Sequence, residues 1–271
     1  MPTSSLSALE SDPSFLRSLG VQLRILHALL MREIITRYGR EGLGFLWVFI
    51  EPMIFTLGVT ALWAAAGMNH GSSIPIVAFA VTGYSSVLLW RNCASRCTMA
   101  IPPNVALLYH RNVRVLDLLW TRVLLEIAGA TVSFIVLSLF FISIGWMPLP
   151  ADLAGVLQGW VLLAWFGTVL ALVIGAGAAY SETVERLWGP ASYLLFPLSG
   201  AAFMVDWLPP NFREVVLLLP MVHGVEMLRE GYFGAAVRTH YDVSYMVVSC
   251  LVLSLAGLFL VRGASRRVQI T

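Results

Sequence analysis

The apolar positions of this chain fall into six long blocks, separated by shorter stretches that carry most of its charged residues. A transmembrane helix needs roughly 20 consecutive apolar residues, which is about the length of each block. The pattern therefore predicts an all-α membrane protein with six transmembrane helices, at about residues 44–66, 74–90, 118–145, 153–180, 187–205 and 243–261. We expect a cytoplasmic N-terminal segment over 1–43, a transmembrane domain over 44–262 and a cytoplasmic tail over 263–271.

The segment before the first block has a different period. Leucine and isoleucine recur every three to four positions from Leu16 to Ile34, while Arg17, Arg24 and Arg32 lie off that stripe. This is the period of an amphipathic helix. An arginine-rich polar side is typical of a helix in the membrane interface, among anionic headgroups. We expect such an interface helix over about residues 16–38.

Small residues in two of the blocks indicate helices that pack against other helices. The second block contains Gly83, Ser85 and Ser86, which suit a helix enclosed by protein better than one surrounded by lipid. The fourth block repeats a small residue every four positions, at Gly167, Ala171, Gly175 and Ala179. Such a ridge lets a neighbouring helix backbone approach closely.

The fifth block and the segment after it are irregular. Pro190 and Pro197 interrupt the fifth block, so its helix must be kinked or shielded by neighbours. Between the fifth and sixth blocks, the apolar run 215–219 is bounded by prolines and is too short to cross a bilayer. We therefore expect a re-entrant or interfacial pair of short helices within 206–242.

Composition agrees with this class and excludes one kind of chemistry. Of the 271 residues, 58% are hydrophobic and 12% are charged, with a mean hydropathy of +0.81, which leaves no room for a sizeable soluble domain. All 17 basic residues are arginine. A Walker-type phosphate loop requires a lysine, so this chain cannot hydrolyse ATP by that route alone. Cys93 and Cys97 have no nearby histidine or third cysteine, so we expect no metal site.

The arginines also predict the orientation of the chain. In the six-helix topology, 14 of the 17 arginines fall on one side of the membrane. The other three, Arg213, Arg229 and Arg238, lie in the segment 206–242. Short loops rich in positive charge stay in the cytoplasm. We therefore expect a multi-pass protein of the bacterial inner (plasma) membrane with both termini in the cytoplasm.

Three stretches resemble one family of transporter subunits. They are 32–39 (REIITRYG) with 43–47 (LGFLW) and Glu51-Pro52, then 103–118, then 220–226 (PMVHGVE). Together they resemble the capsule polysaccharide export permeases, which are membrane subunits of the type-two class of ABC exporters. The resemblance covers nearly the whole chain, and its opening motif is fairly specific to polysaccharide exporters.

The resemblance implies a homodimer of this subunit flanked by two copies of a separate ATPase, which uses ATP and Mg. A lipid-linked capsular polysaccharide would pass between the two membrane halves. A periplasmic polysaccharide copolymerase and an outer-membrane export protein would be further partners, and no nucleic acid is expected. The resemblance implies no cofactor on this chain itself. It also makes the short helices within 206–242 a pair of gate helices at the outer mouth of the channel.

In the family, a short cytoplasmic helix after the second span docks on the ATPase, and the resemblance places it at about 103–111. This stretch mixes apolar and polar side chains, as do segments that seat in a groove on another protein. The docking candidates are Asn104, Leu107, Leu108, Tyr109, His110 and Arg111. A solvated basic loop is the alternative interpretation of the same residues.

A sliding glycan needs aromatic faces and loosely held polar groups along its path, because tight binding would stall transport. The aromatic candidates are Tyr38, Phe45, Trp47, Tyr84, Trp90, Trp188 and Tyr193. Tryptophan and tyrosine also gather at bilayer interfaces, which is the alternative explanation for each. The polar candidates are Glu51, Arg213, His223, Glu226 and Arg229. Glu51 either serves the path or pairs with Arg37 or Arg40, and Glu126 presents a similar choice.

Two other functions fit parts of the sequence. An exporter of lipid-linked O-antigen or teichoic acid would share the architecture and much of the motif content. A membrane-embedded glycosyl- or acyltransferase would use His223 or His110. No nucleophile, metal ligand or catalytic signature accompanies His223 and Glu226 in the sequence. We therefore assign no catalytic residue and expect a transporter subunit rather than an enzyme.

Overall fold

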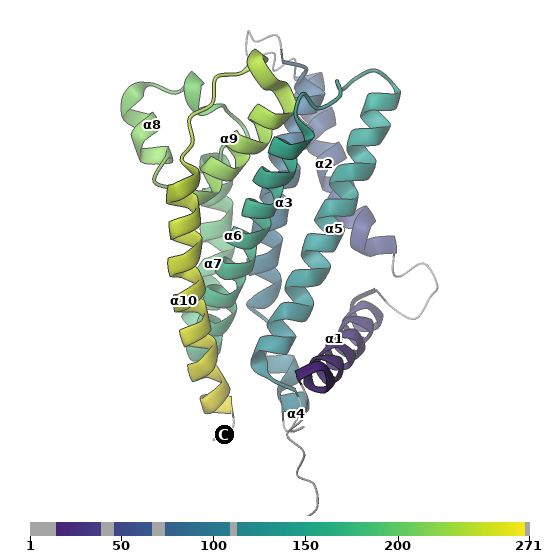
Figure 1. The fold of residues 1–271 in the computed structure, drawn as a ribbon, viewed down its shortest axis with the longest axis vertical. Helices are drawn as coiled ribbons and strands as arrows, with labels where there is room; N and C mark the ends of the chain where they lie inside the picture. Colours follow the sequence, from purple (N-terminus) through teal and green to yellow (C-terminus); the bar gives the residue numbers. More distant parts are fainter. Residues whose placement is uncertain (1–14, 39–45, 67–73, 109–112, 269–271) are drawn as a thin grey trace, which may run out of the picture.

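The structure is a computed structural model that describes residues 15–38, 46–66, 74–108 and 113–268 (Figure 1). Within these ranges all regular secondary structure is helical and no strand is present, which confirms the predicted all-α class. The α-helices are α1 (Phe15–Tyr38), α2 (Trp47–Ala65), α3 (Ile76–Cys97), α4 (Val105–Leu108), α5 (Val115–Ser143), α6 (Leu153–Tyr180), α7 (Glu182–Leu198), α8 (Pro210–Val216), α9 (Pro220–Phe233) and α10 (Val243–Val268). Short 3-10 helices lie at Pro102–Asn104 (η2), Val205–Trp207 (η3) and Gly234–Ala236 (η4).

Among the described residues, four helices are long and apolar enough to cross a membrane: α2, α5, α6 and α10. They coincide with four of the six predicted blocks. The other two blocks, 74–90 and 187–205, form α3 and α7. Neither of these helices is both long enough and apolar enough to be counted with those four, and α7 has only 17 residues. The membrane-protein class is therefore confirmed, while the count of six spans stays a prediction.

Helix α7 begins and ends earlier than the apolar block predicts. Ser181 caps its first turn, because the Ser181 hydroxyl accepts a hydrogen bond from the Thr183 N–H at 3.2 Å. The helix stops before Gly200, whose φ of +82° is a left-handed conformation that glycine adopts without strain. Pro190 and Pro197 both lie within the helix.

Helix α3 is the centre of the bundle. Every residue from Val77 to Trp90 is buried, which confirms that protein encloses the second block. Helix α6 packs on α3 through the predicted ridge, since a Cβ atom added to Gly167 would lie 2.8 Å from the Trp90 Cα. A Cβ atom on Gly159 of α6 would lie 2.7 Å from the Leu228 backbone nitrogen of α9. The glycines of α6 therefore allow backbone contact with both neighbours.

The two ends of the bundle carry different elements (Figure 1). Helices α1 and α4 lie at one end together with the end of α10, and we call this the α1 end. Helices α8 and α9 lie at the opposite end, which we call the α9 end. Pro210 and Pro220 begin the two short helices α8 and α9, as expected for proline at a first helical position. The short helices within 206–242 are thus present, while their re-entrant placement in a membrane stays a prediction.

Candidate functional site

A cluster of ion pairs joins α1 to the bundle at the α1 end. Arg37 of α1 pairs with Glu126 of α5 at 2.5 Å and with Glu51 of α2 at 3.4 Å. Arg96 of α3 pairs with the same two carboxylates, at 3.6 Å and 2.6 Å respectively. Two arginines and two glutamates from four helices therefore form one network, which we call the charge cluster.

The charge cluster answers part of the question that the sequence left open. Glu51 pairs with Arg37, which was one of its two predicted partners, while Arg40 lies outside the described residues. The Glu126 side chain is only 7% exposed, and a buried carboxylate is stable only with partners. Both glutamates therefore act at least as anchors for α1, and a role for Glu51 in a glycan path stays a prediction.

Two polar side chains near the end of α1, Glu33 and Arg37, contact the bundle, whereas Arg17, Arg24 and Arg32 are exposed. The Glu33 carboxylate pairs with Arg122 of α5 at 3.0 Å. In contrast, the apolar residues Leu19, Leu23 and Ile35 are exposed, at 44%, 57% and 45%. The period of the sequence correctly predicted a helix here, but it did not show that Arg37 would bind acidic residues of α2 and α5. The exposed apolar residues are the part of α1 that suits a bilayer.

The predicted docking segment forms η2 and α4, also at the α1 end. Asn104 is 6% exposed; its Nδ2 donates to the Ala100 carbonyl at 2.9 Å, and its Oδ1 accepts a hydrogen bond from Arg32 at 2.7 Å. Leu107 and Leu108 are half-buried, and Leu108 packs against the core. Tyr109, His110 and Arg111 lie outside the described residues. Asn104 thus ties the segment to α1, and docking on an ATPase stays a prediction for all six residues.

At the α9 end, Arg229 of α9 is fully buried. Its guanidinium donates to the backbone carbonyls of Gly200, Ala201 and Phe203, at 2.5, 2.6 and 2.7 Å. It also lies 3.8 Å from the centre of the Phe79 ring of α3. The three carbonyls follow the last turn of α7, where helical partners run out. Arg229 therefore fastens the segment after α7 to α9 and α3.

Glu226 and His223 of α9 are engaged mainly with the backbone. The Glu226 carboxylate accepts hydrogen bonds from the Val205 N–H at 3.1 Å and the His240 N–H at 3.0 Å. His223 Nδ1 accepts from the Asp242 N–H at 2.8 Å, so its other nitrogen, Nε2, donates to the Leu217 carbonyl at 2.8 Å. Both ring nitrogens of His223 are thereby occupied within the chain, which favours a structural role over proton transfer.

Arg213, Asp206 and His240 form a more exposed group at the same end. His240 Nε2 lies 3.0 Å from the Asp206 carboxylate, and Arg213 lies 3.6 Å from it. The hydrogen bond from His240 is the main reason that the pKa of Asp206 lies below its usual value. Arg213 also donates to the Asp206 carbonyl at 3.0 Å. This arginine is therefore paired within the chain, and its contact with a glycan stays a prediction.

The predicted aromatic wall residues divide into exposed and buried ones. Trp47 and Tyr193 are exposed, at 48% and 68%. Tyr84, Trp90 and Trp188 are buried. Phe45 and the side chain of Tyr38 lie outside the described residues. Trp47 and Tyr193 are thus the two of these five that are exposed on the surface of a single chain, with Arg91 lying over the Tyr193 ring at 4.4 Å from its centre. A place in a glycan path stays a prediction for all seven.

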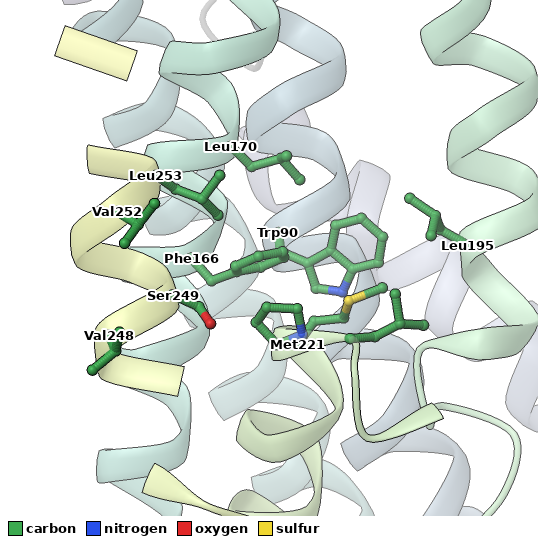
Figure 2. A pocket seen from close by; sticks show the side chains of 11 residues that line it. Trp90, Phe166, Leu170, Leu195, Met221, Val248, Ser249, Val252 and Leu253 are labelled. Carbon is green, nitrogen blue, oxygen red and sulfur yellow. The ribbon is translucent and has the colours of Figure 1, made fainter. Parts of the chain in front are cut away.

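Trp90 lines an apolar pocket of about 460 Å³ among α3, α6, α7, α9 and α10. Figure 2 shows Trp90 beside Phe166, with Val252 and Leu253 of α10 on one side of them and Leu195 of α7 on the other. The Trp90 indole N–H has no hydrogen-bond partner among the described residues. Sugar hydroxyls would find few partners on these walls, so the pocket gives Trp90 no support as a glycan contact.

Comparison with known proteins identifies the family. Residues 24–233 match the ABC-2 type transporter family. The chain is 47% identical over 256 residues to the capsule polysaccharide export inner-membrane protein CtrC of Neisseria meningitidis serogroup B, which covers 94% of this chain and 97% of that protein. It is 44% identical, with the same coverage, to the capsule polysaccharide export inner-membrane protein BexB of Haemophilus influenzae.

A more distant relative fits the same group. The polysialic acid transport protein KpsM of Escherichia coli is 26% identical over 249 residues, which covers 89% of this chain and 94% of that protein. The matches extend over nearly the whole chain and confirm the resemblance that the three sequence stretches indicated. The chain belongs to the ABC-2 type transporter family, in which its relatives include inner-membrane proteins of capsule polysaccharide export.

Proposed function

We propose that this chain is the membrane-spanning permease subunit of an ATP-driven exporter that translocates capsular polysaccharide across the bacterial inner membrane. The near full-length similarity to CtrC and BexB carries the proposal. A homodimer of the chain forms the channel, and two copies of a separate ATPase, which bind ATP and Mg, drive it. The glycan is lipid-linked, and a periplasmic copolymerase and an outer-membrane export protein continue its route.

In this proposal the α1 end lies in the cytoplasm and the α9 end faces the periplasm. The arginine excess near the chain termini supports that orientation, as does the location of α1 and the end of α10 at the same end (Figure 1). Helices α3 and α7 complete a set of six spans; α3 tolerates its polar residues because protein encloses it. Helices α8 and α9 form the re-entrant gate pair.

The docking segment, η2 and α4, receives the motion of the ATPase. Polar contacts link this segment to the spans: Asn104 binds Arg32 of α1, and Arg37, one turn further along α1, enters the charge cluster. That cluster holds Glu51 of α2 and Glu126 of α5. A displacement of the docking segment therefore acts on two spans through α1.

Deletion of the gene in its native bacterium tests the proposal. We expect the surface capsule to disappear, glycan to accumulate in the cytoplasm, and the intact gene to restore both. The readout is capsule staining of whole cells beside staining of thin sections. Undiminished capsule on the deleted strain would refute the export role.

Co-purification with the neighbouring ATPase tests the docking segment. We expect Leu107→Asp to abolish the complex, because a carboxylate on a half-buried apolar position opposes burial in a partner groove. Leu149→Asp is the matched control: Leu149 is 74% exposed and lies in the loop between α5 and α6, outside the docking segment and the spans. Gel filtration establishes that both variants remain folded. If Leu107→Asp retains the ATPase as well as the control does, the docking assignment is wrong, while the capsule assay still judges the export role.

A further inference from the structure

A polar cavity of about 470 Å³ lies under α1 at the α1 end. Its walls come from α1, the end of α3, η2 and α5. Four arginines line it, Arg32, Arg37, Arg96 and Arg122, together with the hydroxyl-bearing Thr36. Guanidinium and hydroxyl groups are the donors that bind phosphate oxygens, and arginine does so with two parallel hydrogen bonds.

The charges around this cavity do not balance. Three carboxylates accompany the four arginines: Glu33 pairs with Arg122, while Glu51 and Glu126 pair with Arg37 and Arg96. Arg32 is the fourth arginine, and its acceptor is the neutral amide oxygen of Asn104 at 2.7 Å. Among the described residues, no carboxylate forms an ion pair with Arg32. Arg32 therefore contributes a positive charge that no carboxylate of the described residues neutralises.

The location of the cavity selects the source of that negative charge. Leu23, Met31 and Ile35 are exposed on α1, so this helix presents an apolar surface beside the polar cavity. Such a surface suits the boundary between hydrocarbon and headgroups. Basic pockets next to membrane helices on the cytoplasmic side are known to hold anionic headgroups. A lipid phosphodiester carries one negative charge and is concentrated in that layer, whereas soluble phosphates are not.

We propose that this cavity binds the phosphodiester headgroup of an anionic membrane phospholipid, with Arg32 as the principal ligand and the Thr36 hydroxyl as a further donor. The acyl chains would lie against the exposed apolar residues of α1. Because Arg32 also holds Asn104, the bound headgroup strengthens the contact between α1 and the docking segment. The inference requires a chain embedded in a membrane, but it does not depend on which glycan the protein exports.

Lipid binding by the full-length chain, purified in mild detergent without the ATPase, tests the inference. The probe is phosphatidylglycerol, titrated and counted on the protein by native mass spectrometry, with phosphatidylcholine and inorganic phosphate as separate arms. We expect Arg32→Gln to weaken the tightest phosphatidylglycerol site about tenfold or more, as loss of a hydrogen bond to a charged group does. Arg24→Gln removes the same charge from an exposed position on α1 outside the cavity and should change affinity less than about twofold.

Two further arms keep the result interpretable. Arg32→Lys keeps the charge without the planar fork and should give an intermediate affinity. Thr36→Val leaves the charge unchanged and should also weaken binding. Equal binding by wild type and Arg32→Gln would overturn the inference. So would displacement of phosphatidylglycerol by an equal concentration of inorganic phosphate, because the source would then be soluble. Neither outcome bears on capsule export, which the deletion experiment judges separately.

Discussion

Replacing Arg229 with alanine should be among the most damaging single changes at the α9 end. The substitution removes donors from three backbone carbonyls, those of Gly200, Ala201 and Phe203, and takes a guanidinium away from the Phe79 ring. Each hydrogen bond to a charged group contributes about 1.5–3 kcal/mol. Water entering the vacated space replaces part of that loss. We therefore expect a net cost of about 3–5 kcal/mol, the range found when one partner of a buried charged contact is removed.

The assay is unfolding of the purified chain in mixed micelles, titrated with sodium dodecyl sulfate and followed by circular dichroism. Arg238→Ala is the matched control, since Arg238 lies after the same helix but is exposed. Arg229→Lys should fall between the control and Arg229→Ala, because an ammonium group cannot reach three carbonyls with a planar fork. If Arg229→Ala unfolds at the same detergent fraction as Arg238→Ala, the three carbonyls do not depend on this side chain and the reasoning fails.

Two further predictions concern packing and pH. Gly167→Val should destabilise the bundle by about 1–3 kcal/mol, since its Cβ would lie 2.8 Å from the Trp90 Cα. Gly58→Val should not destabilise it, because a Cβ at that position meets nothing within 4 Å. The same unfolding titration checks both variants. The depressed pKa of Asp206 adds stability above the pKa of the unfolded carboxyl, about 4, and that contribution is lost as pH falls through the lower folded pKa. Asp206→Asn should therefore lower the free energy of unfolding at pH 6 by the small amount typical of an exposed pair, under about 1 kcal/mol, and its difference from wild type should be smaller at about pH 3. An equal difference at both pH values would contradict this account.

The bounds of a helix were predictable where contact with lipid or a local cap determines them. The block at 153–180 coincides with α6, and the Asp152 carboxylate caps that helix by accepting hydrogen bonds from the Ala154 and Gly155 N–H groups. Hydropathy was less informative where protein replaces lipid around a helix. Helix α3 continues to Cys97, beyond the apolar block, because neighbouring helices supply partners for its polar residues. An apolar block records where a helix meets lipid, not where its backbone hydrogen bonds end.

The sequence singled out several residues of the candidate site, but not the residues that they contact. An ionisable residue inside a span requires a partner, so Glu51 and Glu126 could be singled out from the sequence. Arg96, which binds both, was counted only as a basic residue of the loop after the second span. Arg229 was named as a polar candidate for the glycan path, yet its guanidinium binds the backbone of the segment after α7. Contacts over such separations depend on tertiary packing, which periodicity does not encode.

The two ends of the bundle are held by interactions of different strength. In the charge cluster, the side chains of Arg96 and Glu51 are 38% and 35% exposed, so water and salt weaken that pair, whereas Arg37 and Glu126 are only 18% and 7% exposed. Arg229 is fully buried, and moving it away from its carbonyls would strand a charge and three acceptors without water. A displacement that enters at the α1 end can therefore rearrange the charge cluster while α9 and the segment after α7 move as one body. In the proposed exporter, the adaptable contacts would lie beside the ATPase and the rigid ones at the exit.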